Sequence, residues 1–173
     1  KDINFYKEAV AMKIKILCDS MCDIPEEISK KEYLEMIPLT INIDGKEYKD
    51  GIDFTKVEFY NILETSHTLP KTSQITYMQF KEAFEKYTNE GYDVICLTGS
   101  SKTSGTYQSA VVAKNDTKGN IYIFDTLFLS LGSGQYVIKA CELVEDTNLS
   151  AKEIVQKLEE LRSSTNLFFV PFT

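Results

Sequence analysis

The sequence is organised around the segment Gly99-Ser-Ser-Lys-Thr-Ser-Gly-Thr-Tyr107. The preceding residues 92–98, Tyr-Asp-Val-Ile-Cys-Leu-Thr, form a short apolar run rich in strand-forming side chains. The following residues 107–114, Tyr-Gln-Ser-Ala-Val-Val-Ala-Lys, are typical of a helix. Ligands of open α/β sheets bind where strands end, and the unpaired amides of a helix start attract anions. The segment therefore predicts a strand–loop–helix unit with an amide-rich loop.

The loop over residues 99–106, here called the hydroxyl loop, carries five Ser or Thr residues within seven positions. It is not a P-loop, because Thr106 stands where the phosphate-binding lysine belongs. It lacks the G-x-S-x-G pattern of a nucleophile elbow, and His67 is the only histidine of the chain. One helix cap needs fewer hydroxyls than this loop offers. The residues alone leave helix capping and anion binding as the two interpretations.

Length and composition describe one ordinary globular domain. The chain has 173 residues, of which 43% are hydrophobic and 26% charged. Its formal net charge of −7 argues against nucleic acid or an anionic membrane as a principal partner. No apolar run approaches the roughly 20 residues that a membrane-spanning helix needs, so we expect no transmembrane segment.

The four cysteines show no metal-binding spacing. Cys18 and Cys22 are separated by three residues and have no cluster of further ligands beside them. Cys18 and Cys96 belong to strand-like runs, and Cys141 lies on an apolar helical face. We therefore expect buried free thiols, which suit the reducing cytoplasm.

The chain alternates between strand and helix patterns. Strands are expected over residues 13–18, 36–43, 92–98, 120–125 and 167–170, with a turn at 44–45 that leads into residues 46–48. Capping boxes begin helices at Thr55, Thr76 and Ser150. Residues 65–74 form a polar loop. This alternation predicts an α/β fold with a mostly parallel sheet flanked by helices.

Several side chains acquire expected roles from this pattern. We expect an aromatic stripe in the core, formed by Tyr77, Phe80, Phe84 and Tyr87. We expect the inner face of the last helix to be formed by Ile154, Leu158 and Leu161. Asp19 and Ser20 end a strand and either bind ligand or fasten their own loop. Asp125 also ends a strand, and we expect its carboxylate to accept hydrogen bonds from amides of the hydroxyl loop.

Four ordered motifs carry a family resemblance. The segment Ser100-Ser-Lys-Thr-Ser-Gly-Thr-Tyr-Gln-Ser-Ala110 resembles the signature of the DegV family of bacterial fatty-acid-binding proteins. The same family is indicated by Asp19-Ser-Met-Cys-Asp-Ile-Pro25, Pro70-Lys-Thr-Ser-Gln74 and Ile121-Tyr-Ile-Phe-Asp-Thr126. The resemblance extends over residues 13 to about 170, which is nearly the whole chain.

The resemblance implies a non-enzymatic carrier. Such proteins bind a long-chain fatty acid and present its carboxylate to a separate fatty acid kinase, with no metal, no other cofactor and no catalytic residue. By position, the carboxylate would be held by Thr72 and Ser104, with four residues close by: Ser73, Ser101, Gly105 and Thr106. Two other functions stay open, a hydrolase that uses a serine of the hydroxyl loop and an interaction module without ligand.

The sequence departs from the family pattern at two places. Ile75 stands where the family usually has proline, and we expect it to loosen that loop. Family members continue into a second lobe that supplies a histidine, a role we do not transfer to His67. We expect residues 1–11 to be an extension and residues 12–173 the first lobe, with the second lobe missing. The uncovered apolar surface would then favour a homodimer, and would comprise Leu127, Phe128, Leu129, Leu131, Phe168 and Phe169.

Overall fold

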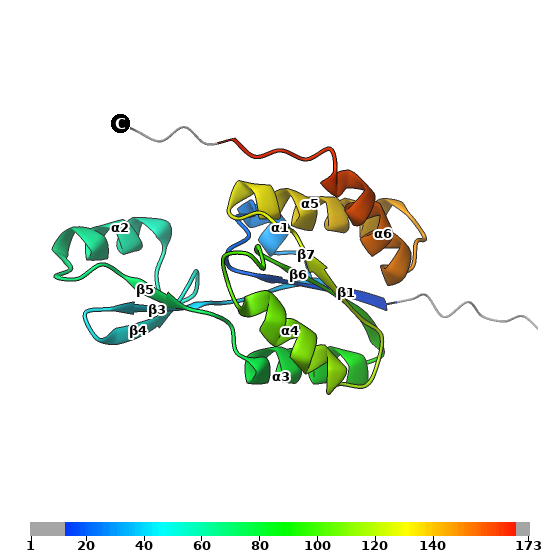
Figure 1. The fold of residues 1–173 in the computed structure, drawn as a ribbon, viewed down its shortest axis with the longest axis horizontal. Coiled ribbons are helices and arrows are strands. Elements are labelled where there is room, and N and C mark those ends of the chain that lie inside the picture. Colours follow the sequence, from blue (N-terminus) through cyan, green and yellow to red (C-terminus); the bar gives the residue numbers. More distant parts are fainter. Residues whose placement is uncertain (1–12, 169–173) are drawn as a thin grey trace, which may run out of the picture.

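The structure is a computed structural model that describes residues 13–168. Its main body is a four-stranded parallel sheet with helices on both faces, and a smaller unit projects from one side (Figure 1). This confirms the predicted fold class, an α/β domain with a mostly parallel sheet flanked by helices. The expected extension over residues 1–11 lies outside the described residues.

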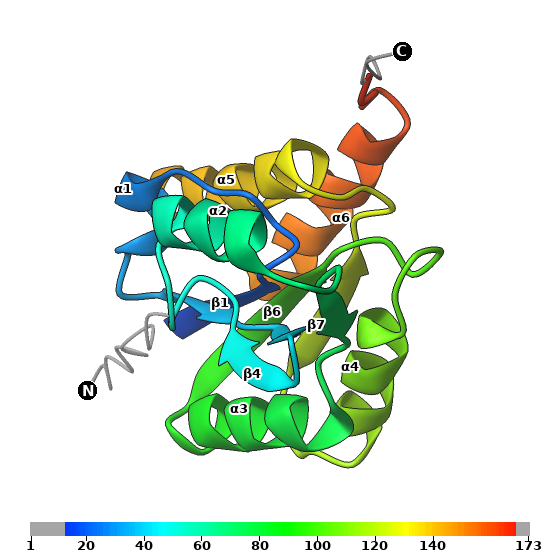
Figure 2. The same cartoon turned by 90° about the vertical axis from the view of Figure 1, so that its left-hand side faces the viewer.

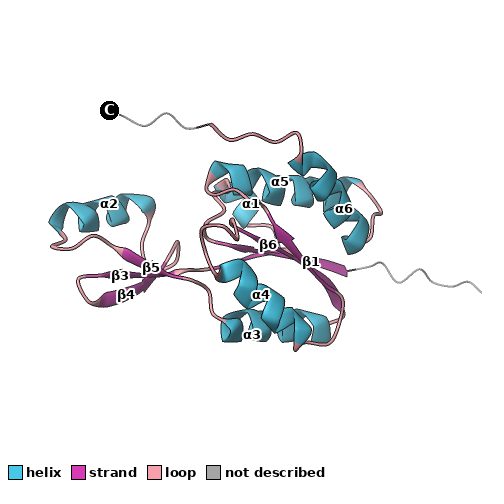
Figure 3. Ribbon diagram, viewed as in Figure 1, coloured by secondary structure: helices cyan, strands magenta, loops and turns pink. Residues whose placement is uncertain are grey.

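The main sheet has the strand order β2-β1-β6-β7. Its strands are β1 (Lys13–Asp19), β2 (Leu34–Ile37), β6 (Tyr92–Thr98) and β7 (Ile121–Asp125). The central strands β1 and β6 pair in register, with Leu17 opposite Cys96. Both are almost wholly buried, as continuous apolar runs in a parallel sheet require. The carboxyl ends of these strands face the smaller unit (Figure 3).

Two pairs of helices cover the sheet. One face carries α3 (Tyr77–Asn89) and α4 (Thr106–Asn115), and the other carries α5 (Leu131–Asp146) and α6 (Ala151–Arg162). A single turn, α1 (Glu26–Ser29), follows β1. These helices complete one apolar cluster on each face of the sheet.

The aromatic stripe of α3 lies in the core as predicted. Phe80, Phe84 and Tyr87 are buried, and Tyr77 packs against the same cluster. On α6, Ile154 and Leu158 are fully buried, but the assignment of Leu161 to the inner face is wrong. Leu161 is 38% exposed because it lines a surface groove between α5 and α6.

The smaller unit, here called the hairpin subdomain (residues 40–73), consists of three strands and one helix. Its antiparallel sheet has the order β4-β3-β5, with β3 (Thr40–Ile43), β4 (Lys46–Lys49) and β5 (Lys71–Ser73). The helix α2 (Lys56–Thr65) covers this sheet, and Phe54 stacks on Phe59 of α2 with 5.1 Å between ring centroids. Seen from its side in Figure 2, the subdomain lies in front of the carboxyl edge of the main sheet.

The structure corrects the predicted secondary structure at three places. The single strand expected over residues 36–43 is two strands in different sheets, because Pro38 has no amide hydrogen to continue a ladder. The polar loop expected over residues 65–74 contains β5, whose pairing with β3 a local pattern does not reveal. Leu167 and Phe168 are irregular, and the rest of the strand expected over 167–170 lies outside the described residues.

The three predicted capping boxes are confirmed. In each, the first hydroxyl accepts from the amide three residues on, and the Glu or Gln at that position accepts from the first amide. Thr55 pairs in this way with Glu58, and Thr76 with Gln79. These local signals set the starts of α2, α3 and α6 independently of the tertiary fold.

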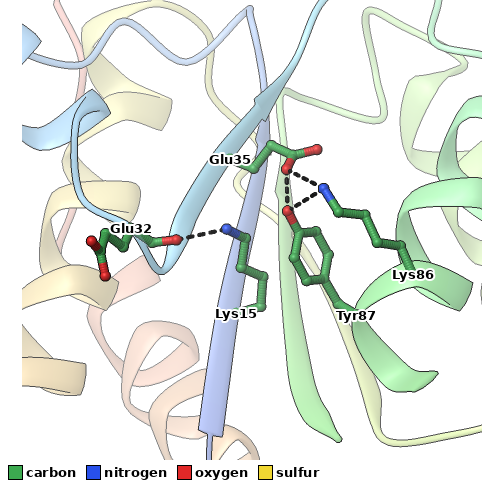
Figure 4. Close-up of polar contacts among 5 residues, drawn as sticks. All are labelled: Lys15, Glu32, Glu35, Lys86 and Tyr87. Atoms are coloured by element: carbon green, nitrogen blue, oxygen red, sulfur yellow. Dashed lines mark hydrogen bonds and ion pairs between the residues drawn. The ribbon is translucent and has the colours of Figure 1, made fainter. Parts of the chain in front are cut away.

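A buried lysine joins the edge strand to α3 (Figure 4). The Lys15 side chain donates to the backbone oxygen of Glu32 at 2.8 Å, and its nitrogen lies 4.5 Å from the Tyr87 ring centroid. Glu35 on β2 accepts from the Tyr87 hydroxyl and from Lys86. Burial lowers the pKa of Lys15. These contacts fasten β2 to the rest of the sheet.

Candidate functional site

Three loops interlock at the carboxyl edge of the main sheet. The amide of Ser130, in the loop after β7, donates to the oxygen of Met21 in the loop after β1 at 2.8 Å. The amide of Ser100, in the hydroxyl loop after β6, donates to the oxygen of Phe128 at 2.9 Å. The loop after β7 therefore touches both other loops, and the three form one surface.

The loop after β7 is also backbone-strained. Leu127 and Ser130 both adopt positive φ angles, of 60° and 55°. Non-glycine residues rarely do so, and the surrounding contacts have to compensate the strain. The Ser130 hydroxyl donates to Asp23 at 2.6 Å, which supplies one such contact. No sequence signal marks the positive φ angles of these two residues, and the sequence analysis did not predict them.

Asp125 holds the hydroxyl loop as predicted. Its Oδ1 accepts from the amide of Ser101 at 3.1 Å and from the amide of Leu127 at 3.0 Å. The neighbouring Thr126 donates through its amide and its hydroxyl to the oxygen of Thr98, at 3.1 and 2.8 Å. The ends of β6 and β7 are therefore fixed to one another.

Asp19 and Ser20 fasten loops. The buried Asp19 carboxylate accepts from the amide of Gly99 at 2.8 Å through Oδ2 and from the amide of Met21 at 2.9 Å through Oδ1. Burial raises the pKa of Asp19 to about 6, although these amides favour the ionised form. The Ser20 hydroxyl accepts from the amide of Leu39 at 3.0 Å. Both residues therefore fasten loops, which is one of the two roles left open for them.

The hydroxyl loop itself lies at the amino end of α4. The Ser104 hydroxyl donates to Thr106 Oγ1 at 2.9 Å and accepts from the Thr106 amide at 3.2 Å. The N-cap residue is Gly105, so no N-cap side chain accepts a hydrogen bond from the first amides of α4. The loop and the first turn of α4 border an open surface pocket of about 350 Å³, lined by Ser101, Lys102, Thr103, Ser104, Gly105, Tyr107 and Gln108. Hydroxyls and the positive end of a helix dipole make this pocket suitable for an anion.

The segment after β5 packs against the hydroxyl loop. The Gln74 side chain donates to Ser109 Oγ at 3.3 Å, and the Ile75 amide donates to Thr106 Oγ1 at 3.3 Å. A β-carbon at Gly105 would lie 2.8 Å from Gln74 Cδ, so glycine permits this close approach. Sequence reasoning did not predict these particular contacts. The motif Thr-Ser-Gln nevertheless singled out the segment that makes them.

Ile75 does not loosen its loop, contrary to expectation. Its side chain is 1% exposed within the core, and its amide makes the hydrogen bond to Thr106. Proline at this position would have no amide hydrogen to donate. The residue that departs from the family pattern therefore supplies a bond that the usual residue lacks.

The six predicted site residues fall into two groups. Ser101, Ser104 and Gly105 line one pocket, and Thr106 is buried beside it with its hydroxyl bonded to Ser104. Thr72 and Ser73 lie on the exposed strand β5, two positions and one position before Gln74. Thr72 pairs with the buried Ile41, so its side chain lies on the face of the small sheet that carries Ile41. The meeting of Thr72 and Ser104 on one anion stays a prediction.

His67 makes no hydrogen bond to the hydroxyl loop among the described residues. Its amide and that of Thr68 each donate to the Asp44 carboxylate at 3.0 Å, at the turn between β3 and β4. These bonds lower the pKa of Asp44, with the bond from the His67 amide as the largest cause. Among residues 13–168, no hydroxyl of the loop bonds to an imidazole or to a carboxylate.

A second cavity of about 170 Å³ lies between the hairpin subdomain and the main body. Aromatic side chains of the subdomain face apolar and polar groups of the body across it. Its lining is Ser20, Cys22, Asp23, Ile24, Met36, Asp50, Gly51, Phe54, Lys56 and Phe59. Its more apolar surface distinguishes it from the pocket at the hydroxyl loop.

All four cysteines are buried free thiols, as predicted. Within the described part of the chain, no three His, Cys, Asp or Glu side chains are grouped so that they could hold a metal ion. No helix among residues 13–168 has the length and apolar character to span a membrane.

Comparison with known proteins gives consistent matches along the chain. The family model described as "Uncharacterised protein, DegV family" matches residues 13–173. A DegV domain-containing protein of Clostridium acetobutylicum is 39% identical over 156 residues, covering 88% of this chain and 56% of the relative. The chain thus spans little more than half the length of the curated relatives it matches.

Solved structures agree with these matches. A Thermotoga maritima protein whose structure reveals a fatty acid binding function is 36% identical, with a TM-score of 0.78 over 88% of this chain and 56% of that chain. The structure of DegV, a fatty acid binding protein from Bacillus subtilis, is 31% identical, with a TM-score of 0.78 over 88% and 54%. The sequence motifs, the fold and these similarities agree, and the chain belongs to the DegV family.

Proposed function

We propose that this chain binds a long-chain fatty acid and holds its carboxylate between β5 and the hydroxyl loop. Support comes from solved relatives that bind fatty acids, at 31% and 36% identity. The observation that carries the proposal for this chain is the contact of Gln74 with Gly105 and Ser109. That contact joins the segment containing Thr72 to the loop containing Ser104.

The proposed ligand contacts follow from hydrogen-bonding chemistry. Thr72 and Ser104 would donate their hydroxyl hydrogens to the two carboxylate oxygens, with Ser73, Ser101, Gly105 and Thr106 beside them. Ser104 already donates to Thr106, so binding exchanges that bond for one to a charged acceptor, which is stronger. The helix dipole of α4 adds a favourable field for negative charge. This arrangement needs no buried arginine.

We further propose that the protein is a carrier rather than an enzyme. Activation of a serine as nucleophile requires an adjacent base. The hydroxyls of Ser104 and Thr106 bond to one another, and the nearest carboxylate in the hydrogen-bond network, Asp125, is engaged by backbone amides. The chemistry would then belong to a partner, a fatty acid kinase that phosphorylates the presented carboxylate in the cytoplasm. The bound acid is the only cofactor-like group that the proposal requires.

Lipid extraction tests the carrier proposal. The purified 173-residue chain is weighed by native mass spectrometry, and its organic extract is analysed by gas chromatography. The proposal predicts a co-purifying long-chain acid that is depleted in Thr72→Ala and Ser104→Ala and retained in Ser163→Ala, a control at the end of α6. An empty protein that turns over p-nitrophenyl esters, with turnover lost in Ser104→Ala, would contradict it.

A further inference from the structure

Asp19 is a buried carboxylate without a cationic partner. Its side chain is fully buried at the end of β1, and no lysine or arginine among the described residues contributes to its electrostatics. Its partners are the amides of Gly99 and Met21 and, at 3.7 Å, the Cys22 thiol. A buried, unpaired charge is unfavourable for folding unless hydrogen bonds compensate it.

Both carboxylate oxygens of Asp19 act as acceptors. Oδ2 accepts from Gly99, and Oδ1 accepts from Met21. The ionised acid offers a strong acceptor at both positions. A protonated acid carries a hydrogen on one oxygen, which becomes the weaker acceptor, and asparagine carries an NH2 group at one position. Protonation would weaken one of the two contacts, and asparagine would set a donor against a backbone donor in one of them.

The two amides that Asp19 joins belong to different loops. Gly99 is the first residue of the hydroxyl loop, and Met21 lies in the loop after β1. The loops are also packed closely, since a β-carbon at Gly99 would lie 2.8 Å from Met21 Cε. The direction in which the hydroxyl loop leaves β6 therefore depends on this carboxylate.

We propose that Asp19 is the positioning residue of the hydroxyl loop, and that its ionised carboxylate keeps Ser104 in the geometry that binds a fatty-acid carboxylate. The second half of this inference rests on the proposed function. Protonation of Asp19 weakens one acceptor and loosens the start of the loop. Ligand affinity then falls in mildly acidic solution, because burial places the pKa of Asp19 at about 6.

No other group that faces Asp19 changes its charge over the pH range in which Asp19 titrates. They are three thiols: Cys18 on β1, Cys22 in the loop after β1 and Cys96 on β6. Burial raises the pKa of each thiol, so all three stay protonated from about pH 5 to about pH 8. From α5, the Ser133 hydroxyl reaches Cys22 and does not titrate.

Amide NMR and ligand binding together test the inference. In the labelled 173-residue chain, we expect the amide resonances of Gly99 and Met21 to titrate together with a midpoint near 6. They should be flat in Asp19→Asn and unchanged in Asp93→Asn, a control at the opposite end of β6 whose carboxylate accepts from Asn120. Binding of the fluorescent fatty acid cis-parinaric acid should weaken at least about tenfold in Asp19→Asn at neutral pH and lose most of its pH dependence.

Both the NMR titration and the binding measurement can contradict the inference. Flat Gly99 and Met21 resonances in the wild-type chain, or Asp19→Asn with wild-type affinity at neutral pH, would overturn the positioning role. A wild-type chain that binds no parinaric acid at any pH, while both amides titrate, would refute the fatty-acid proposal and leave Asp19 as the group that positions the loop.

Discussion

The Gln74 side chain packs directly on the α-carbon of Gly105, although Gln74 follows β5 and Gly105 precedes α4. A β-carbon at Gly105 would meet the amide group of Gln74, with Cδ only 2.8 Å away. The same side chain donates to Ser109 on α4. This contact fastens the segment that follows β5, the last strand of the hairpin subdomain, to the amino end of α4.

The variant Gly105→Ala tests this contact. The added methyl displaces the flexible, exposed Gln74 side chain, so we expect a loss of stability below about 1 kcal/mol together with clearly weaker fatty-acid binding. In the background of Gln74→Ala the same substitution should have little further effect, because the two residues share one contact. Urea unfolding and parinaric acid titration of the four proteins measure this. Additive losses in binding would show that Gly105 acts independently of Gln74.

Asp19 makes stability depend on pH in a specific direction. Its pKa rises from 3.8 in the unfolded chain to about 6 in the folded protein, so the folded state binds the proton more tightly. The corresponding stability is full below about pH 4 and is lost as pH rises through about 6, by up to about 3 kcal/mol. We expect the unfolding free energy of the wild type, measured relative to Asp19→Asn, to fall between about pH 4 and about pH 7. A rise over that interval would contradict the assignment.

The network around Lys15 is expected to serve folding alone. Tyr87→Phe removes the hydroxyl that donates to Glu35 and should lower the unfolding free energy by about 1 kcal/mol. Fatty-acid affinity should not change, because the network joins β2 to α3 (Figure 4) and its hydrogen bonds involve no residue of the interlocked loops. Chemical denaturation and ligand titration of this variant give both values. A parallel loss of affinity would show that this network and the site are coupled.

An exposed apolar surface adjoins the loop after β7. Leu131 and Phe168 are 63% and 87% exposed, and Leu127 and Leu129 are also exposed. Phe128 instead packs against the core, and Phe169 lies outside the described residues. Exposed apolar patches commonly mark interfaces, so we expect the 173-residue chain to self-associate.

Sedimentation velocity checks this expectation with a matched control. Leu131→Lys should shift the chain toward monomer, whereas Ile52→Lys on the hairpin subdomain, a residue that is also 63% exposed, should not. A wild-type chain that stays monomeric at high concentration would contradict the prediction.

Local signals predicted the parts of the fold that local chemistry determines. The apolar run of β6 and the hydroxyl–Glu and hydroxyl–Gln pairs of the capping boxes act within a few residues, and the structure has them at the expected positions. The strand β5 is different. Its three residues Lys71, Thr72 and Ser73 are exposed and polar, and they form a strand only because β3 lies beside them.

In the candidate site, too, some features follow from local sequence and others depend on how distant segments pack. Asp125 could be predicted to hold the hydroxyl loop because it ends a strand that neighbours β6. The contact of Gln74 with Gly105 spans the whole of α3 and β6 in sequence, and the positive φ of Ser130 falls on a residue type that does not favour it. Both depend on how distant segments pack, which the local pattern does not contain.

The central claim, that Thr72 and Ser104 hold one carboxylate, is tested most directly by a double-mutant cycle of fatty-acid affinity. Parinaric acid binding is measured for the wild type, Thr72→Ala, Ser104→Ala and the double variant, with circular dichroism to confirm folding. We predict that each single change weakens binding by about 1.5–3 kcal/mol, the range for a hydrogen bond to a charged group, and that the double variant loses less than the sum. Wild-type affinity in both single variants would contradict the account.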